Sequence, residues 1–238
     1  MKRETQISPA EEANDSVLDN IAWASLTGPH ARFASVLGRA ARYPGDVTTF
    51  VALEPRADVR AWDDLASLFG PGETVALLGA ELRPPATWEV IRTIDCMQMT
   101  GTNIGGEPDH EIVRLSSSDV PEMLALVERT KPGPFLSRTI ELGNYFGIRR
   151  KGDLIAMAGE RLHPPGWTEI SAVCTDAGYR GQGLGGRLMK AVGAGIAARG
   201  ERPLLHAAGD NTNAIRLYED LGFSVRRRIN VEILRIAR

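Results

Sequence analysis

Residues 173–186 read Val-Cys-Thr-Asp-Ala-Gly-Tyr-Arg-Gly-Gln-Gly-Leu-Gly-Gly, and this stretch decides the fold. The run before the glycines, residues 170–174, is apolar and rich in small and β-branched side chains, which predicts a strand. After the glycines, apolar side chains recur at helical spacing, at Leu184, Leu188, Val192 and Ile196. A strand, a glycine-rich loop and a helix in this order are typical of a phosphate-binding site.

The glycines and the arginine of this loop have chemistry suited to an anion. Gly181, Gly183 and Gly185 lack a Cβ, so the backbone can approach a ligand closely and turn its N–H groups toward it. The N-terminus of the following helix carries a partial positive charge. Arg180 adds a permanent charge and a fork of donors that matches phosphate oxygens.

A dinucleotide-binding fold is an alternative, because Gly-x-Gly-x-x-Gly nearly fits residues 181–186. That fold places its glycine loop in the first strand–helix turn and an acidic residue about 20 positions further on, where it holds a ribose. Here the loop comes late in the chain, and the next predicted strand, 203–208, ends without an acidic residue. Both observations argue against a dinucleotide site.

Two motifs resemble those of the Gcn5-related N-acetyltransferase (GNAT) superfamily. The pattern Arg180-x-x-Gly183-x-Gly185 is similar to the acyl-CoA loop of that superfamily. Residues 211–223, Asn-Thr-Asn-Ala-Ile-Arg-Leu-Tyr-Glu-Asp-Leu-Gly-Phe, resemble its second signature, Asn-x-x-Ala-x-x-Leu-Tyr-Glu-x-Leu-Gly-Phe. One predicted helix and one predicted strand separate the motifs, as in the superfamily. The resemblance covers the chain from about residue 112 onward, and residues 138–143 are similar to the branch with FR47-like domains.

The resemblance implies an α/β fold with a mixed, mostly antiparallel sheet flanked by helices, and acetyl-CoA as acyl donor without a metal. In this superfamily the strand before the loop diverges from its neighbour, and its free backbone groups pair with the pantetheine arm. The residues that the resemblance places at acetyl-CoA are Ala172, Val173, Cys174, Arg180, Gly181, Gln182, Gly183, Leu184, Gly185, Gly186, Asn211 and Tyr218.

The implied reaction is direct attack of an acceptor amine on the thioester in a ternary complex. Tyr218 matches the tyrosine that protonates the departing sulfur in the superfamily, and Glu169 is our first choice for the general base. Glu160 and His206 are rival bases. Cys174 lies on the cofactor strand, but the sequence shows no histidine–carboxylate pairing for it, so we do not expect a nucleophile there.

The acceptor is expected to be a small amine or an amino-acid-like compound. In the superfamily, the segment between the first strand and the central hairpin shapes the acceptor pocket. Phe135, Arg138 and Glu141 are therefore candidates for acceptor contacts, with Glu160 at the end of the hairpin. A peptide N-terminal acetyltransferase and a non-catalytic acyl-CoA sensor are the alternatives.

The composition is that of an ordinary soluble globular protein. The chain has 238 residues, of which 43% are hydrophobic and 24% charged, and its formal net charge is −2. This charge gives no general attraction to nucleic acid or to an anionic membrane. Cys96 and Cys174 make neither a disulfide framework nor a metal site, which favours the cytoplasm. The sequence leaves the oligomeric state open, with a homodimer among the alternatives.

The N-terminal half is predicted to be α/β. We expect helices over 15–26 and 61–69, a helix that carries Phe33, Val36, Leu37 and Ala40, and strands over 47–53, 74–78 and 90–99. The polar, glycine-containing residues 101–109 predict a linker. The predicted domains are 1–105 and 106–238. The first is interpreted either as a degenerate second copy of the acetyltransferase fold or as an unrelated cap.

The C-terminal half is predicted in more detail. Strands are expected over 112–115, 145–150, 154–160, 168–175, 203–208 and 223–234, with helices starting near 118 and covering 135–142. Asn213 is expected to cap the helix of the second motif, and Gly222 to end it. Arg226, Arg227 and Arg228 are interpreted as a solvated strand edge, with CoA's 3′-phosphate as the alternative partner.

Overall fold

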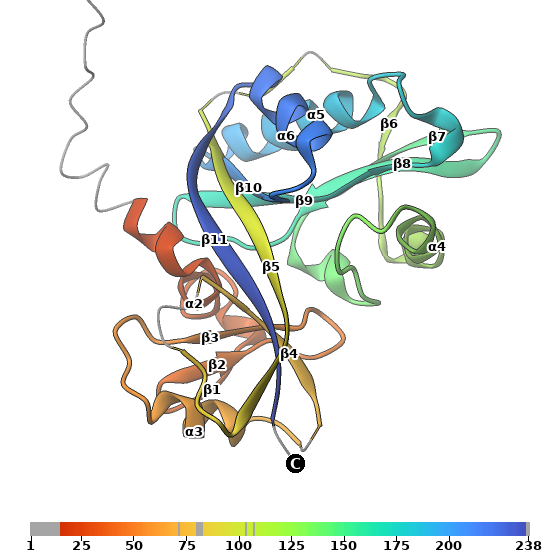
Figure 1. The fold of residues 1–238 in the computed structure, drawn as a ribbon. Helices are drawn as coiled ribbons and strands as arrows, with labels where there is room; N and C mark the ends of the chain where they lie inside the picture. The colour runs from red at the N-terminus through yellow and green to blue at the C-terminus, as the bar shows by residue number, and fades with distance from the viewer. Residues whose placement is uncertain (1–14, 71, 80–82, 103, 107, 237–238) are drawn as a thin grey trace, which may run out of the picture.

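The computed structural model describes residues 15–70, 72–79, 83–102, 104–106 and 108–236. Figure 1 shows two lobes that are joined by two long strands, β5 (Trp88–Gly101) and β11 (Phe223–Ile236). The lower lobe is formed mainly by the N-terminal half of the chain and the upper lobe by the C-terminal half. No helix within the described residues is both long and apolar enough to span a membrane.

The N-terminal half begins with the 3-10 turn Ser16–Asn20 and the short helix α2 (Ile21–Leu26). The remaining elements before β5 are β1 (Ser35–Leu37), β2 (Ala40–Arg42), β3 (Phe50–Leu53), α3 (Ala61–Ala66) and β4 (Thr74–Leu78). Asn20 starts α2 by accepting a hydrogen bond from the Trp23 N–H at 3.3 Å.

The C-terminal half contains two long helices and the strands that the sequence analysis predicts. Its helices are α4 (Val120–Thr130), α5 (Leu184–Ala198) and α6 (Thr212–Asp220). Its strands are β6 (Ile112–Arg114), β7 (Tyr145–Arg150), β8 (Asp153–Glu160), β9 (Trp167–Thr175), β10 (Arg202–Ala208) and β11. Pro121 lies in the first turn of α4, where a backbone N–H would have no acceptor within the helix, so proline breaks no hydrogen bond there.

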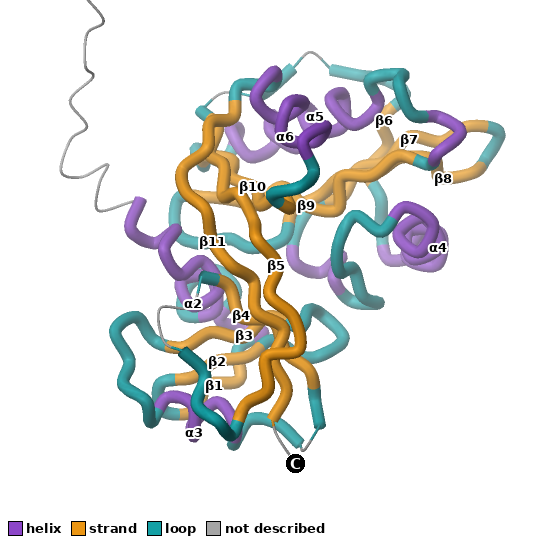
Figure 2. The backbone as a smooth tube through the Cα atoms, viewed as in Figure 1, coloured by secondary structure: helices purple, strands orange, loops and turns teal. Residues whose placement is uncertain are grey.

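All eleven strands of the described residues belong to one sheet in the order β1-β2-β3-β4-β11-β5-β10-β9-β8-β7-β6. Neighbours are antiparallel except β3 with β4 and β9 with β10. The mixed, mostly antiparallel sheet is therefore confirmed. Figure 2 shows its strands running through both lobes, with α5 and α6 on one face and α4 on the other.

The strand order is the same when it is read from either side of the β11–β5 pair, apart from the extra edge strand β6. In each half a hairpin precedes a parallel pair whose strands are joined through a helix, and a long strand follows. The long strands are exchanged: β11 lies between β4 and β5, and β5 lies between β10 and β11. This order is the one expected of a second copy of the fold. The second copy and the division at 105/106 stay predictions, and each long strand lies beside a strand of the other half.

One predicted helix is wrong, and the helix predicted over 135–142 is reduced to a 3-10 turn over Thr139–Leu142. The residues from Ala31 to Arg42 form a 3-10 turn (Ala31–Phe33) and the β1–β2 hairpin instead of a helix. Leu37 pairs with Ala40 across a two-residue turn, and Gly38 in that turn has φ +52°. Glycine adopts this left-handed conformation readily, and the Asp64 carboxylate accepts the Arg39 N–H at 2.9 Å. The turn at Gly38 and the hydrogen bond to Asp64 therefore stabilise a hairpin, although the apolar residues also have helical spacing.

The interpretation of the three arginines as a solvated strand edge holds only in part. They lie on β11 where it pairs with β5, because its pairing with β4 among the described residues begins at Val231, and Arg228 is exposed. The other two are half-buried and contact the N-terminal half. Arg226 donates to the Gln98 side chain at 2.8 Å and to the Asp19 carboxylate at 2.7 Å. Arg227 lies 3.3 Å from the same carboxylate. These two arginines connect the two halves because β11 extends into the N-terminal lobe.

The hydrophobic core consists of separate clusters on the two faces of the sheet. α5 packs its buried side chains, including Leu188 and Val192, against Ile170 of β9 and Leu205 of β10. On the opposite face α4 covers Ala172 and Cys174 of β9. Strand β9 is thus packed on both faces, which fixes the backbone that approaches the glycine loop.

Candidate active site

Strands β9 and β10 separate in the middle of the sheet. They pair in parallel at Trp167–Arg202, Thr168–Pro203 and Glu169–Leu204, and the paired register ends there. Beyond this point β10 continues its pairing only with β5, on its other side. The divergence predicted from the family resemblance is confirmed, and it opens the backbone of β9 from Ile170 onward on its β10 side.

A β-bulge interrupts β9 where it leaves β10. The pairing with β8 passes from Ser171–Gly159 to Cys174–Met157, so β9 has one residue more than its partner in this interval. Ala172 in the bulge has φ +53°, a conformation that costs a non-glycine residue about 1–2 kcal/mol. Bulges turn backbone groups out of a ladder and are frequent beside active sites. Of the predicted pantetheine-binding residues, Ala172 and Val173 lie in the bulge, and Cys174 resumes the pairing with Met157 of β8.

The loop after β9 presents backbone N–H groups at the start of α5. Gly181 and Gly183 have φ +76° and +72°, and Gly183 occupies the N-cap position without a capping side chain. A Cβ at either position would meet no atom within 4 Å, so backbone conformation alone requires glycine there. Within the described residues, the first-turn N–H groups of Leu184, Gly185 and Gly186 have no acceptor.

Arg180 lies exposed beside this helix terminus. Its Nε donates to the Thr175 carbonyl at 3.3 Å, which holds the side chain near the end of β9. A cavity of about 400 Å³ adjoins the loop on the side of α4 and is lined by Asp176, Tyr179 and Arg129, among others. The loop, the arginine and the start of the 15-residue helix α5 present donors and positive charge that suit an anion, and the binding of a diphosphate there stays a prediction.

The second motif forms α6 and the turn before it. The Asn211 side chain accepts the Ala214 N–H at 3.2 Å and so caps this helix, whereas Asn213 lies in the first turn. The prediction that Asn213 is the cap is therefore wrong. Gly222, with φ +94°, follows the C-cap residue Leu221 and ends the helix as expected.

Tyr218 lies on α6 and packs edge-to-face on Phe223, with ring centroids 6.3 Å apart. Burial raises the pKa of Tyr218 to about 12. The phenol is therefore protonated at neutral pH and can donate a proton, which is the protonation state that the predicted role of an acid needs.

Glu169 is buried in a network that leaves its carboxylate no free oxygen. Arg161 donates to both oxygens, at 2.9 and 2.6 Å, and the side chain of Glu169 has 0% exposure. His206 Nδ1 lies 2.8 Å from Oε1. Burial raises the pKa of Glu169, but the charge and hydrogen bonds of Arg161 outweigh this effect and hold it well below its usual range. This geometry argues against Glu169 as the general base and gives it a positioning role.

The two rival bases, His206 and Glu160, also have hydrogen-bond partners within the protein. The Gln98 amide Nε2 faces His206 Nε2 at 3.1 Å, while Gln98 Oε1 accepts from Arg226 at 2.8 Å. This orientation makes His206 Nε2 an acceptor and Nδ1–H the donor to Glu169. Glu160 is 1% exposed and accepts from the Asn144 backbone at 3.0 Å and from Arg199 at 2.9 Å.

A cluster of buried histidines lies beside Glu160, and the sequence analysis missed it. The rings of His30 and His163 are 4.9 Å apart, and His30 Nδ1 lies 3.0 Å from the Tyr43 hydroxyl. Burial lowers the pKa of His30 to about 3 and also lowers that of His163. The two histidines are 133 positions apart, and neither belongs to a motif, so no local pattern signals their contact.

The predicted acceptor residues are only partly accessible. Phe135 is 4% exposed and packs against Tyr145, with ring centroids 5.3 Å apart, so we do not retain it as an acceptor contact. Arg138 and Glu141 are bound to each other at 2.7 Å, and Arg138 lies 3.3 Å from Asp46 of the N-terminal half. Their acceptor role stays a prediction, and their observed contacts join the two halves.

Cys174 lies under α4 and is inert in this environment. Burial raises the pKa of its thiol to about 11, so almost no thiolate forms at neutral pH. Among the described residues, no group of three or more His, Cys, Asp or Glu side chains could hold a metal ion.

Comparisons with known proteins place this site in a family. The family model of FR47-like proteins matches residues 145–231. An acetyltransferase structure assigned to the GNAT family from Novosphingobium aromaticivorans DSM 12444 is 40% identical, with a TM-score of 0.86, and the match covers 93% of this chain and 99% of that one. The comparison with curated proteins found no match.

Two more distant structures share the fold over nearly the whole chain. A GCN5-related N-acetyltransferase from Kribbella flavida is 16% identical, with a TM-score of 0.59 and 98% coverage of both chains. A GNAT-family acetyltransferase from Colwellia psychrerythraea is 15% identical, with a TM-score of 0.53 and coverage of 98% and 99%.

The fold and the loop at the start of α5 define an acyltransferase of the acyl-CoA-dependent class. Within that class, the chain belongs to the GNAT family and carries an FR47-like region. The GNAT fold implies that acetyl-CoA binds.

Proposed function

We propose that this protein transfers the acetyl group of acetyl-CoA to the amino group of a small amine or an amino-acid-like compound, with both substrates bound at once. The observation that carries the proposal is the divergence of β9 from β10, directly beside the glycine loop and the bulge at Ala172. Acetyl-CoA supplies an activated thioester carbonyl when it is bound.

The loop supports the diphosphate part of the proposal. The N–H groups of residues 181–186 and the Arg180 guanidinium would bind the diphosphate oxygens, since they are donors without competing carboxylates at hydrogen-bonding distance in the described residues. Gln182 and Leu184 contribute through their backbone. The opened side of β9 would bind the amide-rich pantetheine arm through the backbone of residues 172–174.

The chemistry needs one bond to form and one to break. The acceptor nitrogen attacks the carbonyl carbon, the C–S bond breaks, and the Val173 N–H polarises the carbonyl oxygen in the proposed geometry. Tyr218, which is protonated at neutral pH, gives its proton to the departing sulfur, although its raised pKa makes it a weaker acid than an ordinary phenol. The proton that the amine loses leaves through solvent, and Glu169 holds Arg161 and His206 in place rather than accepting it.

Release of the CoA thiol in the presence of a panel of acceptors tests the proposed function. We expect turnover with small amines or amino acids. Turnover that occurs only with peptide N-termini would support the peptide acetyltransferase instead, and tight acetyl-CoA binding without turnover on either panel would support the sensor.

A pair of glycine variants tests where acetyl-CoA binds. Gly183 and Gly200 flank the two ends of α5, both have positive φ, and a Cβ at either would meet no atom within 4 Å. Gly183→Ala and Gly200→Ala should therefore cost similar stability, about 1 kcal/mol each. Only Gly183→Ala is expected to weaken acetyl-CoA binding, by tenfold or more in a calorimetric titration. Equal affinities of the two variants would contradict the assignment of the loop.

A further inference from the structure

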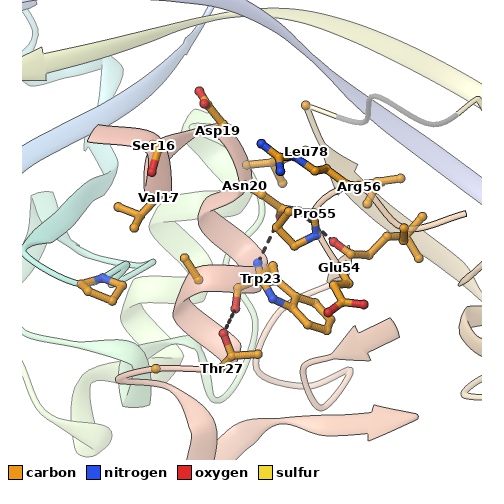
Figure 3. A pocket seen from close by; sticks show the side chains of 17 residues that line it. Ser16, Val17, Asp19, Asn20, Trp23, Thr27, Glu54, Pro55, Arg56 and Leu78 are labelled. Carbon is orange, nitrogen blue, oxygen red and sulfur yellow. Dashed lines mark hydrogen bonds between the residues drawn. The ribbon is translucent and has the colours of Figure 1, made fainter. Parts of the chain in front are cut away.

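The N-terminal half contains a cavity of about 750 Å³ that the proposed acyl transfer does not use. Figure 3 shows its walls, which come from the 3-10 turn before α2, from α2 itself, and from the chain that follows β3 and β4. The volume lies within the range of about 300–1,000 Å³ that is typical of small-molecule sites.

The cavity lies where the parallel pair of the N-terminal half separates. β3 and β4 pair at Phe50–Ala76 and Val51–Leu77, and the paired register ends there. Leu53 at the end of β3 and Leu78 at the end of β4 line the cavity beyond this point. In the strand order of the sheet, β3 and β4 correspond to β9 and β10, so the cavity occupies the place of the acyl-CoA cleft in the other half.

The surroundings of this cavity do not suit a diphosphate. Residues 54–60, which follow β3, contain no glycine, in contrast to the loop that follows β9. The helix after them, α3, has only six residues, and Asp63 and Asp64 lie in its first turn. Two carboxylates at a short helix oppose the binding of a dianion there. We therefore expect the cavity to bind a ligand that is smaller than CoA and has no diphosphate.

The walls combine an apolar surface with one positive charge. Val17, Trp23 and Leu78 of the lining belong to or pack against the core cluster on the α2 side of the sheet, whereas Leu53 and Leu77 belong to the cluster around α3. The indole of Trp23 stands in the cavity in Figure 3. The surface on the α2 side would accept the body of an apolar ligand. The half-buried indole adds an aromatic face for an aromatic or branched group.

The acidic residues of the lining have cationic partners. Asp19 lies 2.7 Å from Arg226 and 3.3 Å from Arg227, and Glu54 lies 4.0 Å from Arg39. The remaining charge in the lining is Arg56, which has no hydrogen bond or ion pair within the described residues, and its side chain extends over the cavity in Figure 3. Arg39 also pairs with Asp58, at 2.9 Å, so it is shared between two carboxylates. Arg56 is the charged group of the described lining that is available to an anion.

The backbone around the charge is held in an unusual conformation. Arg56 has φ +60°, which is rare for a side chain of this size and is found at ligand-binding positions. The Asn20 side chain donates to the Leu53 carbonyl at 2.7 Å, so α2 fixes the opposite wall. Both walls are thus preformed.

We propose that this cavity is a second ligand site, for a small monocarboxylate with an aromatic or branched apolar body. The carboxylate binds the Arg56 guanidinium, and the body lies against Val17, Trp23 and Leu78. The site is separate from the acyl-transfer cleft and does not depend on it.

Calorimetric titration with 3-phenylpropionate tests the proposal on the full chain. We expect one saturable site with a dissociation constant below about 1 mM. Arg56→Gln should weaken binding at least tenfold, because the charge-assisted hydrogen bonds are lost. Arg60→Gln is the matched control: Arg60 is an exposed arginine of the same segment that pairs with Asp58 at 2.8 Å outside the lining, and its variant should bind like the wild type.

Two further measurements separate this site from the acyl-CoA cleft. The neutral 3-phenylpropionamide should bind at least tenfold more weakly than the acid, and saturating acetyl-CoA should leave the affinity for the acid unchanged. The proposal would be overturned if the acid and the amide bound with equal affinity, or if Arg56→Gln bound the acid as tightly as the wild type does. It would also be overturned if acetyl-CoA displaced the acid. None of these outcomes bears on acetyl transfer, whose own test is the release of the CoA thiol.

Discussion

At the scale of single residues, Tyr218 is the clearest catalytic assignment to test. Its pKa of about 12 keeps the phenol protonated, and a proton donor to the leaving sulfur contributes about 10²–10⁴-fold to a rate. We expect Tyr218→Phe to lower kcat at saturating acceptor by about 100-fold and to change acetyl-CoA affinity less than threefold. Initial rates of thiol release and a binding titration measure the two quantities.

Tyr145 provides the matched control for that variant. Its hydroxyl is also buried, has no hydrogen-bond partner in the described residues, and lies in the core under α4. Tyr145→Phe should therefore keep kcat and should not lower the free energy of unfolding. A Tyr218→Phe enzyme with the wild-type kcat would remove the assignment of Tyr218 as the acid.

The buried histidine His30 makes stability depend on pH. Its pKa is about 3 in the folded protein and near 6.5 in the unfolded chain, so the unfolded chain takes up the proton first as the pH falls. The free energy of unfolding should decrease from about pH 6.5 downward, by about 2 kcal/mol at pH 5 for this one group.

Urea unfolding at pH 7.5 and pH 5 measures this effect. His30→Gln removes the titrating ring, so its stability should fall about 2 kcal/mol less than that of the wild type over the same pH interval. Equal losses in the two proteins would show that His30 does not titrate between its folded and unfolded states as described.

The sequence predicts residues whose roles are local, and it fails where partners are distant. Arg180, the loop glycines and Tyr218 lie within short motifs, so their positions follow from spacing. Glu169 was chosen as a base from its place on a strand, and its partner Arg161 belongs to the turn after β8, where the sequence gives no sign of the ion pair. The contact of His30 with His163 could not be predicted for the same reason, because the two residues are far apart in the sequence.

At the scale of elements, the ion pair between Arg161 and Glu169 holds the start of β9 against the turn that follows β8. Both side chains are buried, so removal of Arg161 leaves a carboxylate without its partner. We expect Arg161→Met to lower the free energy of unfolding by about 3–5 kcal/mol. Replacing both residues by Met should cost clearly less than this single change, because the double variant leaves no charge buried.

Chemical denaturation of the two single variants and the double variant gives the coupling energy of the pair. His206 stays in the double variant and keeps its contact with Gln98, so a residual loss of stability is expected from its lost bond to Glu169. Additive effects of the two single changes would contradict the pairing.

The prediction of elements succeeded where a pattern was long. β7, β8, β9, β10 and β11 lie within one or two residues of their predicted bounds, because each combines a clear period with turn residues near its ends. The segment from Ala31 to Arg42 failed, because a short hairpin around Gly38 places the same apolar residues at a spacing that also fits a helix. The bulge at Ala172 has no sequence signal, since alanine rarely adopts φ +53°.

At the scale of the whole molecule, β5 and β11 are exchanged, so that each half contributes its long strand to the part of the sheet formed by the other half. β5 pairs with both β10 and β11, and β11 also pairs with β4. Opening one half would expose strand edges of the other. We therefore expect the chain to unfold in one cooperative transition, despite the predicted division at 105/106.

Tryptophan fluorescence can follow the outer core of the N-terminal half and the junction of the two halves. Trp62 lies in the core around α3, and Trp167 at the start of β9 packs in the cluster that contains the buried side chains of α2. Variants that keep only one of these indoles, with the other tryptophans changed to Phe, should give the same urea midpoint. Two midpoints that differ clearly would mean that the halves unfold as independent domains.

The exchanged order could not be predicted from the sequence. Each long strand has the alternation of an ordinary strand, and nothing in it indicates which partner lies beside it. The weak resemblance between the halves lies in the order of their elements, while the glycine loop and the Asn-x-x-Ala signature occur only in the second. The two cavities differ accordingly, one beside a diphosphate loop and one beside Arg56.

Hydrogen exchange of the full chain with and without acetyl-CoA shows where acetyl-CoA binds. We expect acetyl-CoA to slow exchange in peptides covering the bulge of β9 and the loop at the start of α5, residues 170–187. Exchange that is slowed elsewhere, such as around Leu53 and Arg56, while residues 170–187 remain unchanged, would contradict this expectation.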